Sequence, residues 1–131
     1  MSQPHAFRRA AEAKDLDLMR ETLHEDVVLH SPILFKGFEG RDTAMFVLAN
    51  VIEVFEDFRY LDEAHGDGTV VLRFAAKVEG KFEIEGVDYL TLDADGRVAD
   101  LTVFLRPLKA VNAFAEKMSV EFAKAMQEAQ L

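Results

Sequence analysis

Hydrophobic positions change their spacing about halfway along the chain, from a helical to an alternating period. Before Phe58, apolar residues recur at steps of three and four, which is typical of amphipathic helices. After it, apolar and polar residues alternate, which is typical of strands that bury one face. The expected elements are, in order, helices at 3–14 and 16–23, a strand at 26–31, a loop at 37–40, a helix that Asp42 or Thr43 caps and that ends near 56, strands at 58–63, 69–79, 81–92 and 97–106, and a final helix that Pro107 begins.

This separation of helices from a run of strands predicts an α+β fold. The last four strands are joined by short turns, so they should form an antiparallel meander that curves over the helices. No linker or repeat divides the 131 residues, and we expect one domain over 1–131. The alternation predicts which strand residues face inward, toward Phe7, Leu48 and Phe55: Leu72, Phe74, Leu90, Leu101 and Val103.

Asp88 is the most informative residue of the strand at 81–92. It shares its alternation phase with Leu90 and Leu92, so its carboxyl group should point toward the core. An acid on an apolar face costs free energy unless it is hydrogen-bonded or protonated. We therefore expect Asp88 at the floor of a pocket, either as a structural acid with satisfied partners or as a group that binds a ligand or takes part in catalysis.

Charge and composition narrow the range of partners. The net charge of −9 argues against nucleic acid and against an anionic membrane surface. The sequence has no apolar run long enough to cross a membrane and no apolar stretch of a signal peptide, so we expect a cytoplasmic protein by default. It has no cysteine and no pair of histidines with metal-ligand spacing, so we expect no metal site and no cofactor.

Four short motifs together resemble the nuclear transport factor 2-like superfamily, and within it the SnoaL-like bacterial proteins. In chain order they are Ala13–Asp17, Val28–Pro32, Gly40–Asp42 and Asp93–Val98. The resemblance covers roughly residues 7–118. It implies a cone, in which a bent, mostly antiparallel sheet wraps around the N-terminal helices and leaves a cavity open at one end. The members include steroid isomerases, polyketide cyclases, epoxide hydrolases and non-catalytic proteins, so the resemblance leaves the reaction open.

The resemblance to ketosteroid isomerases can be carried over one position at a time. It places their protonated oxyanion-hole aspartate on Asp88, their proton-shuttling aspartate on Ser31 and their oxyanion-hole tyrosine on Phe7. A serine cannot serve as a carboxylate base, and a phenylalanine cannot donate a hydrogen bond. The steroid isomerase mechanism is therefore disfavoured.

Two other chemistries of the superfamily are less constrained. The limonene epoxide hydrolase type needs two carboxylates and an arginine around one water, but Asp100 and Arg73 are expected on the faces of their strands opposite the apolar residues. The polyketide cyclases use an acid in the cavity, and Asp88 with His30 nearby would satisfy that requirement. His30 alternates with Ser31, so only one of them should face the cavity, and a strand-end histidine bonded to backbone is the competing interpretation.

Two classes of function remain. The first is a protein that binds a small hydrophobic molecule, or an enzyme with acid–base chemistry of the isomerase, cyclase or hydrolase type, with Asp88 and His30 as catalytic candidates. Tyr60 could offer its hydroxyl to the cavity or could simply pack. The predicted ligand-binding residues are Phe7, Ser31, Tyr60, Phe74, Leu90, Leu101 and Val103. The second class is a non-catalytic dimerising module whose cavity is only packing.

A homodimer is expected in either case. The outward phase of the meander carries an apolar set that a monomer would expose to water, namely Val87, Tyr89, Thr91, Thr102 and Phe104. The resemblance implies pairing through this sheet surface, and two-fold pairing is the commonest oligomer of soluble proteins. The C-terminal helix could instead cover part of the same surface within one chain.

Overall fold

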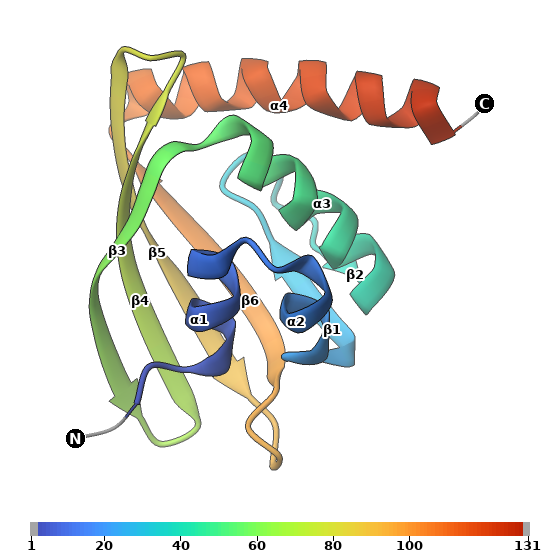
Figure 1. Cartoon of the computed structure of the whole chain (residues 1–131), viewed down its shortest axis with the longest axis vertical. Helices are drawn as coiled ribbons and strands as arrows, with labels where there is room; N and C mark the ends of the chain where they lie inside the picture. Colours follow the sequence, from blue (N-terminus) through green and yellow to red (C-terminus); the bar gives the residue numbers. More distant parts are fainter. Residues whose placement is uncertain (1–2, 130–131) are drawn as a thin grey trace.

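A six-stranded, strongly curved sheet organises the computed structural model, which describes residues 3–129 (Figure 1). The elements in chain order are α1 (Ala6–Ala13), α2 (Leu16–Glu21), β1 (Leu23–His30), β2 (Phe38–Glu39), α3 (Arg41–Val54), β3 (Glu56–Gly66), β4 (Thr69–Val78), β5 (Phe82–Leu92), β6 (Val98–Arg106) and α4 (Leu108–Ala129). The strand order is β2-β1-β6-β5-β4-β3. Helices α1, α2 and α3 lie in front of the sheet, and α4 crosses one end of it (Figure 1). This is the α+β cone that the sequence predicts.

Local side-chain chemistry explains where the first two helices separate. Lys14 adopts a left-handed conformation with φ of 53°, which ends α1. Asp15 then caps α2, because its Oδ1 accepts a hydrogen bond from the backbone N–H of Leu18 at 3.0 Å. The expected restart of the helix at this point is confirmed.

The start of α3 differs from the sequence expectation. Gly40, with φ of 93°, is the N-cap residue, so the prediction of Asp42 or Thr43 as the cap was wrong by two or three positions. The N–H of Gly40 donates to the carbonyl oxygen of Val27 at 2.8 Å, which ties this loop to β1. The same tether allows Phe38–Glu39, expected as loop, to pair with β1 as a short strand.

Strand β1 begins at Leu23, three residues before the expected start. Leu23 is completely buried and lies in register with Val98 of β6. The N–H of Val98 also donates to the carbonyl oxygen of Thr22 at 2.8 Å. The pairing of β1 with β6 is parallel, whereas the pairs from β3 to β6 are antiparallel as expected. Burial against β6 therefore places Leu23 in the strand, although its helical spacing had assigned it to the second helix.

The inward phase of the meander forms the floor of the core. Leu72, Phe74, Leu90 and Leu101 are each no more than 1% exposed. Asp88 shares this phase and is 7% exposed, so the predicted inward direction of its side chain is confirmed. The buried carboxyl group of Asp88 lies in the wall of a cavity.

Candidate functional site

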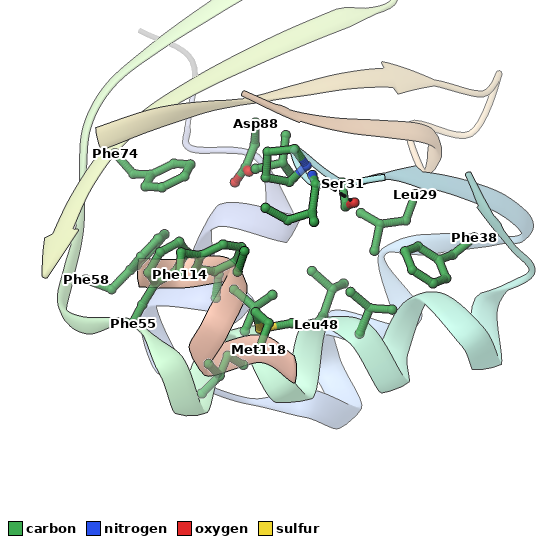
Figure 2. A pocket seen from close by; sticks show the side chains of 18 of the residues that line it. Leu29, Ser31, Phe38, Leu48, Phe55, Phe58, Phe74, Asp88, Phe114 and Met118 are labelled. Carbon is green, nitrogen blue, oxygen red and sulfur yellow. Dashed lines mark hydrogen bonds between the residues drawn. The ribbon is translucent and has the colours of Figure 1, made fainter. Parts of the chain in front are cut away.

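The concave side of the sheet encloses a cavity of about 360 Å³ with almost entirely apolar walls (Figure 2). This volume lies within the usual range of small-molecule binding sites. Strands, helices and the loop after β1 all contribute, and the lining residues used below are Phe7, Leu29, Ser31, Ile33, Leu34, Phe38, Val47, Leu48, Val51, Phe55, Phe58, Tyr60, Phe74, Asp88, Val103, Phe114 and Met118. The fold therefore supplies the apolar pocket that the cone shape implies.

Asp88 is the polar centre of this wall. It lies on β5 between Leu72 of β4 and Val103 of β6, and its Oδ2 accepts a hydrogen bond from the hydroxyl of Tyr60 at 3.0 Å. Burial raises the pKa of Asp88 from 3.8 to about 7, and the Tyr60 bond offsets part of that rise. Because Tyr60 bonds to Oδ2, the other oxygen, Oδ1, can interact with a ligand. Near neutral pH the carboxyl group can either donate or accept a proton.

Tyr60 keeps its own proton under these conditions. Burial, together with the negative charge of Asp88, raises the pKa of Tyr60 well above its ordinary value. The guanidinium of Arg8 lies 5.6 Å from the centre of the Tyr60 ring, and it also pairs with Glu63 at 3.2 Å and with Glu12 at 3.5 Å. These contacts connect α1 to β3 and help to hold the tyrosine hydroxyl toward Asp88.

Ser31 supplies a second hydroxyl to the cavity. Its Oγ accepts hydrogen bonds from the backbone N–H groups of Ile33 and Leu34, at 3.3 and 3.1 Å. These bonds shape the loop after β1 and leave the hydroxyl proton for another acceptor. Figure 2 shows Ser31 and Asp88 on the sheet side of the cavity, with the Asp88 oxygens toward Phe74 and the Ser31 oxygen beside Leu29.

His30 lies away from the cavity, which removes the geometric basis for its predicted role beside Asp88. Its Nε2 lies 3.0 Å from Asp100 Oδ2, and the hydroxyl of Thr102 donates to Asp100 Oδ1 at 3.2 Å. The reason is the pleat: from Val27 onward the inward and outward positions of β1 alternate, so Leu29 and Ser31 face inward and His30 faces outward.

The other predicted ligand-binding residues divide into two groups. Phe7, Ser31, Tyr60, Phe74 and Val103 line the cavity. Leu90 and Leu101 do not, because they pair across β5 and β6 one inward step beyond Asp88 and Val103, where both are buried in the core. These two leucines, predicted to contact the ligand, instead pack in the core.

Sequence reasoning placed several lining residues in the core without assigning them to the cavity. Phe55 was expected in the core, Phe58 opens the predicted meander, and Phe114 lies on the helix that Pro107 was expected to begin. Ile33 and Leu34 follow Pro32, and two apolar residues in an exposed loop were the available signal that this loop borders a pocket. Their exposed fractions are 42% and 55%.

Between residues 3 and 129, no helix is long and apolar enough to cross a membrane. Within the same range, no three His, Asp or Glu side chains gather where they could hold a metal ion.

The chain has clear relatives. Residues 5–101 match the family model of the SnoaL-like domain. A steroid delta-isomerase from Pseudomonas aeruginosa is 35% identical with a TM-score of 0.86, and the match covers 92% of this chain and 89% of that one. A bacterial protein with a cystatin-like fold from Silicibacter pomeroyi DSS-3 is 33% identical with a TM-score of 0.85, covering 95% and 86%.

More distant structures share the fold alone. A candidate polyketide cyclase from Sinorhizobium meliloti is 16% identical with a TM-score of 0.63, and the match covers 76% of this chain and 90% of that one. No curated protein matches the chain significantly. The matched family model spans most of the chain, and both closer structures align over nearly its whole length. The chain therefore belongs to the SnoaL-like family, with the nuclear transport factor 2-like fold.

Proposed function

We propose that the protein binds a small, mainly apolar molecule in the cavity and that Asp88 acts on a carbonyl or hydroxyl oxygen of this molecule. The observation that carries the proposal is a buried acid, held by Tyr60, in the wall of a large apolar cavity. Protein interiors are otherwise close-packed, so a cavity of this size is typical of a ligand site. A purely structural module would gain stability by filling it.

The chemistry follows from the protonation of Asp88. Below pH 7 the neutral acid donates a hydrogen bond from Oδ1 to a ligand oxygen and polarises the carbonyl group. Above pH 7 the carboxylate accepts a proton from a ligand hydroxyl or from a carbon next to a carbonyl group. A pKa of about 7 suits both roles, because a general acid or base works best near the ambient pH.

Steroid isomerisation by the ketosteroid isomerase mechanism is not part of the proposal. A Pseudomonas aeruginosa relative carries the name steroid delta-isomerase. In this chain, however, Ser31 and Phe7 face the cavity at the positions that the resemblance assigns to the base and the second donor. Among the described lining residues, Asp88 is the sole carboxyl group, so no second carboxylate of the lining can share a proton transfer with it.

Substituting Asp88 tests the proposal directly. Asp88→Leu is expected to weaken the binding of 4-phenyl-2-butanone by about fivefold to 150-fold, since leaving a buried carbonyl oxygen without its hydrogen bond costs about 1–3 kcal/mol. Asp88→Asn, which keeps an amide donor, should lose less. Calorimetric titration measures the affinity, and Glu85→Gln, on the outward face of the same strand, should bind like the original protein. Unchanged ketone binding by Asp88→Leu would refute the proposal, and so would the absence of binding to the original protein.

The proposal extends to a homodimer formed through the outer face of the sheet. Val87 and Tyr89 of β5 lie opposite Phe104 and Thr102 of β6, which places an apolar block on this face. Tyr89 is 42% exposed and Phe104 is 56% exposed. A second copy of the chain, related by a two-fold axis, would cover the block with the same surface.

Light scattering at micromolar concentration tests the dimer. The original chain of 14.7 kDa is expected to give about twice that mass, whereas Phe104→Glu should give a monomer because it places a charge in the proposed interface. Val120→Glu is the matched control, since Val120 is 49% exposed and lies on α4, not on a strand of the sheet. A monomer mass for the original chain would contradict the proposal.

A further inference from the structure

Most of the aromatic side chains that line the cavity lie together on one side of it. Five rings form a connected group that we call the aromatic cluster: Phe55, Phe58, Tyr60, Phe74 and Phe114. The centres of neighbouring rings lie close together, at 5.0 Å for Phe58 and Phe74 and at 5.1 Å for Phe55 and Phe114. All five residues line the cavity, so a ligand on this side would contact ring faces and edges.

The opposite side of the wall is mainly aliphatic. We call it the aliphatic side, and it consists of Leu29, Ile33, Leu34, Val47, Leu48 and Val51, from β1, the loop after it and α3. Figure 2 shows Leu29 and Leu48 across the cavity from Phe58 and Phe74, with Phe38 beyond Leu29. Unlike the aromatic cluster, this side includes the half-exposed Ile33 and Leu34 of the loop, and we therefore place the opening of the cavity here.

Two of the polar lining residues, Asp88 and Ser31, lie at different positions relative to these two sides. Asp88 bonds to Tyr60, which is itself part of the aromatic cluster, so the acid lies beside the rings at the closed end. Ser31 begins the loop that contributes Ile33 and Leu34, so it lies toward the aliphatic side. A ligand oxygen at Asp88 therefore has aromatic neighbours, while carbon atoms further from that oxygen have aliphatic ones.

Building on the proposed function, we infer that the ligand class is an aromatic ketone with an alkyl chain. The ring lies in the aromatic cluster, the carbonyl oxygen meets Asp88, and the chain runs along the aliphatic side toward the loop after β1. A cavity of roughly 150 Å³ holds a benzene ring. The volume of about 360 Å³ leaves more than half of the space for the carbonyl group and the chain.

Two series of ketones test the inference in the full-length protein. The phenyl series runs from acetophenone to octanophenone, and the second series replaces the phenyl ring with cyclohexyl at each chain length. We expect each phenyl ketone to bind about threefold to tenfold tighter than its cyclohexyl counterpart, the gain typical of an aromatic pair. Affinity should rise about fourfold per methylene, until the chain reaches the opening.

Variants on each side of the cavity separate the two contributions. Leu48→Phe fills the aliphatic side, so it should weaken the binding of octanophenone at least tenfold. The binding of acetophenone, which has no long chain, should not change. Val51→Phe repeats the test from the next turn of α3, should Leu48→Phe fail to fold. Phe114→Leu removes one ring, so it should reduce the phenyl preference and keep the dependence on chain length.

The outcomes distinguish this inference from the proposed function. Equal affinity for the two series, or affinity independent of chain length, would overturn the aromatic-ketone class, while Asp88-dependent ketone binding would still support the proposed function. Binding of no ketone, or ketone binding unaffected by Asp88→Leu, would overturn both. A phenyl preference that Phe114→Leu reduces and a chain-length dependence that Leu48→Phe abolishes would support the inference.

Discussion

Replacing Asp88 with asparagine is expected to stabilise the protein at pH 8 by up to about 4 kcal/mol. Burial raises the pKa of Asp88 from 3.8 to about 7, and one unit corresponds to about 1.4 kcal/mol. At pH 8 the original protein must therefore keep a buried carboxylate, which Asp88→Asn removes. The amide oxygen of asparagine can still accept the hydrogen bond from Tyr60, so little is lost in exchange.

The pH range of the effect follows from proton linkage. Between pH 4 and 7 the native state holds the Asp88 proton while the unfolded chain has released it. Stability therefore falls as the pH rises through this window and is constant above it. Below pH 4 both states are protonated, and the two proteins should be equally stable. Glu63, whose pKa is lowered by its hydrogen bonds despite partial burial, acts in the opposite direction, but equally in both proteins.

Urea unfolding at pH 4, 6 and 8, followed by circular dichroism, measures this difference. We expect the stability advantage of Asp88→Asn over the original protein to increase from pH 4 to pH 8. Glu25→Gln, which replaces an exposed acid on β1, should show no such increase. Asp88→Asn that costs several kcal/mol at pH 8 would contradict the prediction. It would mean that the carboxylate has a favourable charged partner in the native state.

The inward direction of Asp88 could be predicted from the sequence, but its partner could not. Strand alternation is a local property, and it placed Asp88, Leu72 and Phe74 correctly. The bond to Tyr60 joins β5 to β3 across the whole width of β4, so it depends on the register of two strand pairs and on the curvature of the sheet. No pattern within one strand encodes that combination.

Several features of the N-terminal half escaped prediction for a similar reason. Strand β1 pairs in parallel with β6, which lies more than seventy residues away in the chain, and this contact extends β1 back to Leu23. The short strand Phe38–Glu39 exists because β1 offers it an edge. The size of the cavity depends on how far α3 and α4 stand from the sheet, which the packing of many side chains decides together.

Gly86→Ala is expected to destabilise the protein by about 3 kcal/mol, the upper part of the usual range for overpacking. Gly86 shares the inward phase of Asp88 on β5 and lies opposite Phe74 and Leu105. A Cβ atom at this position would lie 2.3 Å from the carbonyl oxygen of Phe104, 2.7 Å from the Leu105 side chain and 2.8 Å from the ring of Phe74. The glycine is therefore required for space, because it lets Phe74 lie across β5 within the aromatic cluster.

The nearest atom, the carbonyl oxygen of Phe104, determines whether a second substitution can restore the lost stability. Phe74→Leu would remove the ring contact but not the contact with the Phe104 carbonyl oxygen, and a backbone atom cannot move aside as a flexible side chain can. The double variant should consequently remain as unstable as Gly86→Ala or become less stable. Gly66→Ala is the matched control, since its Cβ would meet Thr69 at an ordinary 3.7 Å. Recovery of stability in the double variant would show that Phe74 alone, and not the backbone of β6, requires glycine at position 86.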